Sequence, residues 1–266
     1  MRYAFMTFSV PQATLEQALA LAKKYGYDGI EPRAEAKHSH GVELSASKAQ
    51  RAAIGKQAQD AGIALACVAT SCTYADPATA ASNTRLTHEY IDLAADVGAP
   101  SIRVFGGKLG GGWTREQAIV EVAKSLASVA DHAAQRGVTV CMETHDDWCD
   151  PIHVAEVMRR VAKPSIAVTW DIMHPVRAAG YAMAAAYEPI KPWIRHVHFH
   201  DGTMELKKSV FKPIGTGAID HAAAVALLAG SGYAGFLSGE WINWEIPPEQ
   251  HLPDEIAKMK AFEKKR

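Results

Sequence analysis

A glycine that closes a helical segment and leads into an apolar, strand-like run recurs along this 266-residue chain. The clearest copies read Y-G-Y-D-G-I, A-G-I-A-L-A, V-G-A-P-S-I-R-V and R-G-V-T-V-C-M-E, with glycines at Gly26, Gly62, Gly98 and Gly137. Glycine readily takes the left-handed conformation that ends helices. Apolar runs without polar alternation are typical of parallel strands buried on both faces. The repeat therefore predicts helices that alternate with parallel strands.

Eight strands are expected in total. They are predicted at residues 3–8, 28–32, 64–69, 101–105, 138–143, 166–171, 194–200 and 236–240. The main helices between them are predicted at residues 14–25, 47–61, 84–97, 114–135 and 151–161. One βα unit per roughly 33 residues is the size expected of a (β/α)8 barrel. An open doubly wound sheet is the alternative, but no G-x-G-x-x-G motif follows the first strand. With no low-complexity linker, residues 1–266 are predicted to form one single-domain TIM barrel.

Charge and cysteine usage restrict the partners and the compartment. The formal net charge of −1 gives no electrostatic reason to expect nucleic acid or an anionic membrane as a partner. No apolar stretch approaches the roughly 18 residues that a membrane span requires. The four cysteines show no C-x-x-C spacing, which favours a reducing compartment. We therefore expect a soluble cytoplasmic protein, with a homo-oligomer left open.

Acidic residues end three of the predicted strands. Glu143, Asp171 and Glu240 close the fifth, sixth and eighth runs, and His198 lies near the end of the seventh. A carboxylate buried at the end of an apolar strand must be paired or bound to a cation. Considered singly, each of these four residues could simply be the first residue of a loop. On four successive barrel strands, at spacings of about one βα unit, they favour a shared metal site.

The seventh strand offers more than one candidate ligand. Its sequence R-H-V-H-F-H places His196, His198 and His200 on one face of the strand, and the pattern alone leaves His198 and His200 nearly equal. Three carboxylates and one imidazole make a mostly hard-oxygen site. Such a set suits Mn²⁺, Mg²⁺ or Co²⁺ better than a thiolate-type zinc site.

Several motifs together resemble a known superfamily. They are C-M-E-T-H at 141–145, D-I-M-H at 171–174, H-V-H-F-H-D at 196–201, P-I-G-T-G-A-I-D at 213–220 and G-F-L-S-G-E at 235–240, with Y-G-Y-D-G-I-E at 25–31 and I-R-V-F-G-G at 102–107. This combination resembles the xylose isomerase-like barrel superfamily of sugar phosphate isomerases/epimerases. That superfamily includes ketose 3-epimerases, inosose and dehydroshikimate dehydratases, and the fourth AP-endonuclease family.

The resemblance implies a metal-ligand set. It implies that Glu143, Asp171, His198 and Glu240 hold one divalent metal ion, with Mn²⁺ expected first and Mg²⁺, Co²⁺ or Zn²⁺ as alternatives. By the same resemblance, His174 would face the substrate. The trinuclear endonuclease branch is not expected, because the third and fourth strands end in A-T-S and V-F-G instead of histidines, and F-K-P at 211–213 replaces its D-x-H.

The resemblance also implies the chemistry. Glu143 and Glu240 would be the acid/base pair of an isomerase or epimerase that acts on a ketose or keto-sugar through a metal-stabilised enediolate. A metal-dependent dehydratase or eliminase of a keto-sugar or keto-cyclitol would share that intermediate and is the main alternative. A non-catalytic binding barrel is a third, which the intact ligand set disfavours. The expected partner is a small carbohydrate, with an unphosphorylated one slightly favoured.

Three further residues are candidates for the site. His145, two residues after Glu143, is either an additional base and substrate hydrogen-bond donor or an ordinary loop histidine. Arg103 could bind an anionic or hydroxyl-rich substrate, or be buried in the barrel by a salt bridge. Lys108 lies on a glycine-rich loop without Walker spacing, which suggests the edge of a mobile lid more than a phosphate cradle.

Overall fold

The strands curl into a nearly closed parallel barrel in this computed structural model, which describes residues 1–205, 210–242 and 245–264. The strand order of the nine-stranded sheet is β3-β2-β1-β11-β8-β7-β6-β5-β4. Its members are β1 (Arg2–Met6), β2 (Gly29–Glu31), β3 (Ala64–Leu65), β4 (Val68–Ala69), β5 (Ser101–Phe105), β6 (Thr139–Glu143), β7 (Ile166–Asp171), β8 (Ile194–Phe199) and β11 (Phe236–Gly239). The predicted fold class is confirmed.

The barrel closes within its third strand. β3 and β4 are two parts of one predicted run, interrupted at Ala66 and Cys67. β3 pairs with β2, and β4 pairs with β5. The Ala69 N–H also donates to the carbonyl of Pro32 (2.9 Å), just after β2. The two ends of the sheet therefore belong to the same short segment of chain.

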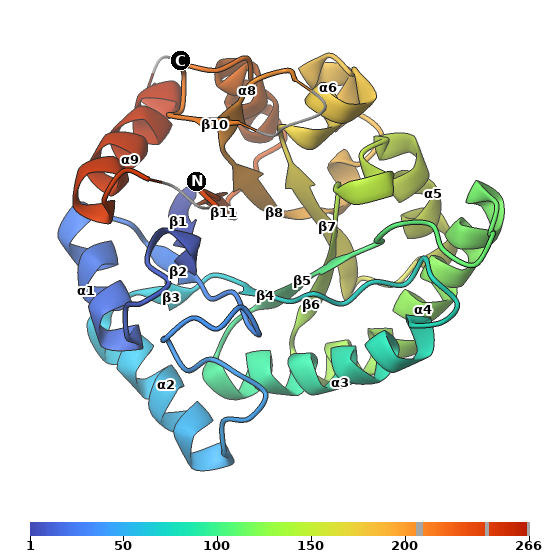
Figure 1. The fold of residues 1–266 in the computed structure, drawn as a ribbon, viewed down its shortest axis with the longest axis horizontal. Helices are drawn as coiled ribbons and strands as arrows, with labels where there is room; N and C mark the ends of the chain where they lie inside the picture. The colour runs from blue at the N-terminus through green and yellow to red at the C-terminus, as the bar shows by residue number, and fades with distance from the viewer. Residues whose placement is uncertain (206–209, 243–244, 265–266) are drawn as a thin grey trace.

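Helices surround the strands on the outside (Figure 1). They are α1 (Leu15–Tyr25), α2 (Lys48–Ala61), α3 (Ala80–Val97), α4 (Arg115–Arg136), α5 (Pro151–Val161), α6 (His174–Ala179), α7 (Met183–Tyr187), α8 (His221–Gly230) and α9 (Pro248–Lys264). In the part of the chain that the structure describes, no helix is long and apolar enough to span a membrane. A short hairpin of β9 (Asp201–Gly202) and β10 (Phe211–Lys212) follows β8.

The helix ends form as the glycine repeat predicts. Gly26, Gly62, Gly98 and Gly137 all follow helices with φ values of 77°, 71°, 81° and 70°. At the other end, Thr114 forms a capping box at the start of α4, as threonine and serine also do in α1 and α2. These local signals set the length of each helix and return the chain to the barrel at regular intervals.

Some strand boundaries differ from the prediction because local turns compete with the sheet. β1 ends at Met6, since residues 7–9 form a 3-10 helix. β8 ends at Phe199, and β11 ends at Gly239, one residue before Glu240. The helix predicted at 84–97 begins earlier, at Ala80. The shifts are small, and the predicted ligands remain at the C-terminal end of the barrel.

A buried carboxyl group joins α9 to the loop before α8. Glu255 is 1% exposed and accepts a hydrogen bond from the Ile214 N–H (2.9 Å). Burial raises the pKa of Glu255 to about 7 from its ordinary value of 4.5. The folded protein therefore resists ionisation of this group, whereas the unfolded chain does not.

We expect Glu255→Gln to be increasingly stabilising, relative to the wild type, as the pH rises from 4.5 to 8. A raised carboxyl pKa stabilises the fold fully below the unfolded-state pKa, and this contribution is lost as the pH rises through about 7. The glutamine cannot ionise and can still accept from Ile214. The difference in the free energy of unfolding should change by about 3 kcal/mol across this range, measured by urea unfolding. If the free energies of unfolding of the two proteins change in parallel with pH, the raised pKa of Glu255 is contradicted.

Candidate metal centre

Four neighbouring strands of the barrel bring the predicted ligands together. Glu143 and Asp171 are the last residues of β6 and β7, His198 lies on β8 and Glu240 follows β11. Asp171 and His198 are paired in the register of β7 and β8. One nitrogen or carboxylate oxygen from each of the four lies within 4.8 Å of the others. The convergence expected from their spacing is present, and all four are at most 5% exposed.

Two of the carboxylates have one oxygen held by a neighbouring donor group. Arg103 Nε forms an ion pair with Glu143 Oε2 (3.1 Å). Asp171 Oδ1 accepts hydrogen bonds from the backbone N–H groups of Met173 (2.8 Å) and His174 (2.9 Å) at the start of α6. These contacts fix one oxygen of each carboxylate. The second oxygen is left for the interior of the site.

The imidazole of His198 lies between carboxylates on both sides. Its Nδ1 is 2.9 Å from Glu143 Oε1 and 3.2 Å from Glu240 Oε2. Its Nε2 is 3.1 Å from Oε1 of Glu31, the last residue of β2. Glu143 Oε1, Glu240 Oε2 and His198 Nδ1 therefore converge on one small volume.

The charges in this volume depend strongly on one another. Burial opposes ionisation of Glu240, but protonated His198 holds the pKa of Glu240 well below its usual value. Burial likewise disfavours the charged form of His198, yet Glu143, Glu31 and Glu240 raise the pKa of His198 well above its ordinary value. Without a cation, the cluster therefore balances its carboxylates with a proton on the imidazole.

The donor set fits a divalent cation. Three carboxylates and one imidazole are ligands that hard divalent metals accept. Asp171 Oδ2 is buried and lies 2.8 Å from His200 Nε2 and 3.8 Å from His174 Nε2. A buried carboxylate oxygen needs a positive partner, which a bound cation would also supply.

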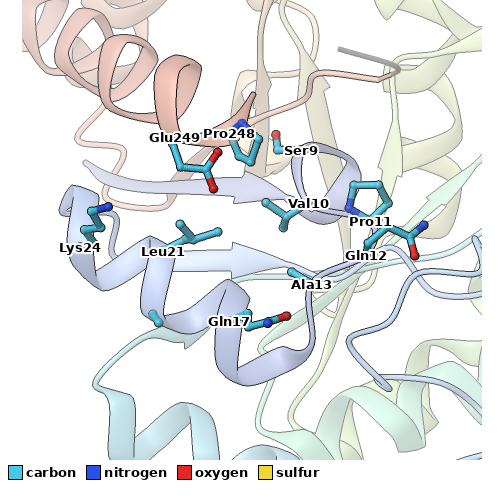
Figure 2. Close-up of a pocket in the computed structure, with 11 residues that line it drawn as sticks. Ser9, Val10, Pro11, Gln12, Ala13, Gln17, Leu21, Lys24, Pro248 and Glu249 are labelled. Atoms are coloured by element: carbon cyan, nitrogen blue, oxygen red, sulfur yellow. The ribbon is translucent and has the colours of Figure 1, made fainter. Parts of the chain in front are cut away.

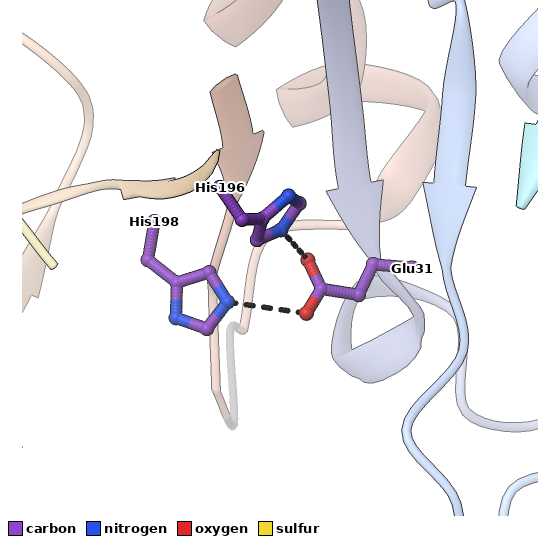
Figure 3. Close-up of side chains that lie close together, drawn as sticks. All are labelled: Glu31, His196 and His198. Carbon is purple, nitrogen blue, oxygen red and sulfur yellow. Dashed lines mark hydrogen bonds and ion pairs between the residues drawn. The ribbon is translucent and has the colours of Figure 1, made fainter. Parts of the chain in front are cut away.

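The three histidines of β8 and the residue after it have separate contacts. His198 contacts Glu143 and Glu240, whereas His200 contacts Asp171 and, through Nδ1, donates to the carbonyl of Glu240 (3.2 Å). His196 does not belong to the four-ligand group and contacts the carboxylate of Glu31 (Figure 3). His198 and His200, which the sequence pattern leaves nearly equal as ligands, thus lie at different depths in the barrel and contact different carboxylates.

His145 and His174 lie at the rim of this centre. Their ring centroids are 4.4 Å apart, and their side chains are 31% and 15% exposed. Burial acts against the charged form of His145, but the hydrogen bond to Asp146 raises its pKa to about 9. Burial is the main cause that lowers the pKa of His174. The two imidazoles at the rim therefore differ in pKa, with that of His145 above and that of His174 below the ordinary value.

Arg103 and Lys108 differ greatly in exposure. Arg103 is 1% exposed, ion-pairs with Glu143, donates to the carbonyl of Thr70 (2.8 Å) and lies over the ring of Phe105. These contacts match the alternative in which a salt bridge buries this arginine. Lys108 is exposed on the loop after β5, and the backbone of the next residue, Leu109, donates to an aspartate beyond β6. The structure does not bring Lys108 among the four candidate ligands.

Sequence reasoning gave no role to Glu31, although its signal was the same as that of the other acids. It ends an apolar strand, is 0% exposed and lies with His196 and His198 in a second cluster of possible ligand atoms. The predicted strand at 28–32 ends one residue later, at Pro32, whereas β2 ends at Glu31 itself. A buried carboxylate at the end of any barrel strand is a sufficient reason to include it.

A pocket elsewhere in the barrel is separate from this centre. It has a volume of about 630 Å³ and lies between α1 and the start of α9 (Figure 2). Its lining is mostly apolar and includes Val10, Pro11, Leu21 and Pro248, with Lys24 at one side. None of the candidate site residues is among the described residues that line it. The candidate site is therefore identified by its cluster of ionisable side chains and not by this pocket.

Comparison with known proteins identifies the family of this chain. The family model "xylose isomerase-like TIM barrel" matches residues 19–262. The chain belongs to this family. A 3-dehydroshikimate dehydratase of Bacillus anthracis is 25% identical over 114 residues, which span 42% of this chain and 40% of that relative. The alignment thus covers less than half of either protein.

Solved structures share the fold over nearly the full length. An L-ribulose 3-epimerase aligns with a TM-score of 0.81 and 19% identity, over 99% of this chain and 95% of the other. A xylose isomerase domain protein from Planctomyces limnophilus aligns with a TM-score of 0.77 and 20% identity, over 99% and 96%. At these identities the likeness establishes the barrel fold.

The loop after β10 is built around one carboxylate. Asp201 is 0% exposed; its Oδ1 accepts from the N–H groups of Gly202 (2.8 Å) and Ile219 (3.2 Å), and its Oδ2 from Gly215 and Gly217 (both 2.9 Å). A Cβ at Gly217 would come within 2.2 Å of Asp201 Oδ1, so only glycine allows this approach. The G-T-G motif is therefore explained by the close approach of the backbone to a buried anion.

We expect Asp201→Asn to lower the free energy of unfolding by at least about 2 kcal/mol, since either orientation of the amide would direct its NH₂ at two backbone N–H donors. Asp220→Asn is the matched control. Asp220 caps α8 by accepting from the Ala223 N–H (3.0 Å), and asparagine caps equally well. Urea unfolding of both variants tests the prediction, and equal losses would contradict it.

Proposed function

We propose that this protein is a divalent-metal-dependent isomerase or epimerase that acts on a ketose or keto-sugar. The observation that carries the proposal is the convergence of Glu143, Asp171, His198 and Glu240 at the C-terminal ends of neighbouring barrel strands. Chemistry in barrels of this kind takes place at that end. Mn²⁺ is the metal we propose first because oxygen donors dominate the set, with Mg²⁺, Co²⁺ and Zn²⁺ as alternatives.

The two glutamates are suited to proton transfer on a bound sugar. When bound, a divalent cation would polarise the carbonyl of an α-hydroxy ketone and make the neighbouring C–H more acidic. Glu143 ends β6 and Glu240 follows β11, and a carboxylate oxygen of each lies within 3.2 Å of His198 Nδ1. We assign them as the base and acid that remove and return the proton.

The position to which the proton returns decides the product. Return to the same carbon from the opposite face gives epimerisation, and return to the adjacent carbon gives isomerisation. His174 and His145, which are partly exposed at the rim, would bind the substrate hydroxyl groups. Arg103 would orient Glu143 through their ion pair, and the exposed Lys108 would lie at the entrance to the site. The structural likeness to an L-ribulose 3-epimerase supports this assignment.

A dehydratase or eliminase of a keto-sugar or keto-cyclitol is the second candidate. Removal of the same proton, followed by departure of a β-hydroxyl group, gives an enone instead of a sugar. The observation that favours it is the partial sequence match to a 3-dehydroshikimate dehydratase. Both candidates need the same ligands and the same base, and they differ in the fate of the β-substituent.

We expect purified wild-type protein to bind one divalent ion per chain and Glu143→Gln to bind it far more weakly. The loss should exceed the roughly 10–100-fold that is typical when a residue behind a ligand is changed. Isothermal titration with Mn²⁺ measures the dissociation constant. The matched control is Glu255→Gln, a buried acid-to-amide change in α9, and it should bind as the wild type does. Undiminished binding by Glu143→Gln would contradict the ligand assignment.

The two candidate reactions can be separated with a panel of ketoses and keto-cyclitols in D₂O. Isomerisation or epimerisation should incorporate solvent deuterium at the carbon next to the carbonyl, without loss of water. We expect deuterium exchange, detected by NMR, that is abolished in Glu240→Gln because the base is removed. A new enone absorbance in the ultraviolet would show the eliminase to be correct.

A further inference from the structure

The carboxylate of Glu31 bridges two imidazoles inside the barrel. Glu31 Oε2 is 2.7 Å from His196 Nε2, and Glu31 Oε1 is 3.1 Å from His198 Nε2. Figure 3 shows both rings directed at the two oxygens of this one carboxylate. All three residues are at most 1% exposed. Glu31 ends β2, whereas both histidines belong to β8, so the contact crosses the interior of the barrel.

We propose that Glu31 is a positioning residue that accepts the Nε2 proton of His198 and thereby leaves Nδ1 as the metal-binding atom. The proposal rests on the proposed function. A neutral imidazole has one N–H and one lone pair, so the partner of one nitrogen decides the role of the other. His198 Nδ1 lies within 3.2 Å of oxygens of Glu143 and Glu240. A metal ligand at that position requires the proton to be on the opposite nitrogen.

A hydrogen bond from the non-ligating nitrogen of a metal-binding histidine has known effects. A carboxylate that accepts from the second ring nitrogen fixes the tautomer, orients the ring and makes the ligating nitrogen more basic. Glu31 is placed to do all three, since its Oε1 is the acceptor nearest His198 Nε2 that the structure shows among the described residues. The carboxylate itself does not belong to the four-ligand group around Glu143. It therefore acts on the metal through His198.

His196 completes the arrangement. Residues two apart on a strand project to the same side, so His196 and His198 reach the same carboxylate. Their ring planes are at 84° with centroids 5.5 Å apart, which lets each ring offer its Nε2 to a different oxygen. With both oxygens engaged, the Glu31 carboxylate has no free rotation about its last bond. His196 thus has a role, although it is not itself a member of the four-residue group.

Glu31→Gln tests the proposal. A glutamine is neutral and has one acceptor oxygen for two imidazoles. In either orientation His198 loses the carboxylate that makes its ligating nitrogen more basic, and with the NH₂ toward His198 the wrong tautomer is also favoured. We expect the dissociation constant for Mn²⁺ to rise about 10–100-fold, measured by isothermal titration of the purified protein. Glu255→Gln, a buried acid-to-amide change away from the centre, should leave the constant within about twofold. An unchanged constant in Glu31→Gln would overturn the proposal.

A second readout requires no variant. In wild-type protein with ¹⁵N-labelled histidine, long-range ¹H–¹⁵N NMR should show a proton on His198 Nε2, shifted downfield by its hydrogen bond to the Glu31 carboxylate. Addition of diamagnetic Mg²⁺ should leave this proton in place and remove any proton from Nδ1. An unprotonated Nε2 in the wild type would overturn the proposal even if Glu31→Gln did not fold. Failure of the wild type to bind Mn²⁺ would instead remove the proposed function, while the Nε2 signal would still report whether Glu31 accepts the proton.

Discussion

The compensation of buried negative charge is the constraint on which the site depends. Glu31, Glu143, Asp171 and Glu240 all lie at the C-terminal end of the barrel with almost no exposure to solvent. An unpaired carboxylate in such a place would cost several kcal/mol. Each of these acids therefore has a partner within hydrogen-bonding or ion-pairing distance, and the identity of the partner decides which oxygen faces inward.

The partners come from elements that a barrel supplies in fixed positions. β5 provides Arg103 for Glu143, the start of α6 provides two N–H groups for Asp171, and β8 provides an imidazole for Glu240. The register of the neighbouring strands holds these partners in place beside the acids. The geometry is that of a preorganised centre, in which the cost of orientation was met on folding.

Much of this arrangement could be predicted from sequence, for local reasons. Glycines such as Gly98 must follow helices because few other residues adopt their backbone conformation freely, and Glu143 must face a special environment because it ends an apolar strand. The short helices α6 and α7 were not predicted, since five or six residues are too few to show a helical period.

The depth of each side chain in the barrel could not be predicted. His196, His198 and His200 share one face in the sequence pattern, and only the surrounding strands distinguish them. The role of Glu31 depends on a contact with residues more than 160 positions away. Alternation within a strand shows which face a residue occupies, but closure of the barrel determines what it meets there.

The contact between β2 and β8 also constrains how the chain can fold during synthesis. Glu31 is synthesised early, yet its imidazole partners lie 165 and 167 residues later. On the ribosome, an N-terminal portion of the barrel would hold this acid without its partners and could not bury it at low cost. The contact therefore cannot form until β8 has been synthesised. A nascent or truncated chain that ends before β8 would keep this end of the barrel open and hydrated.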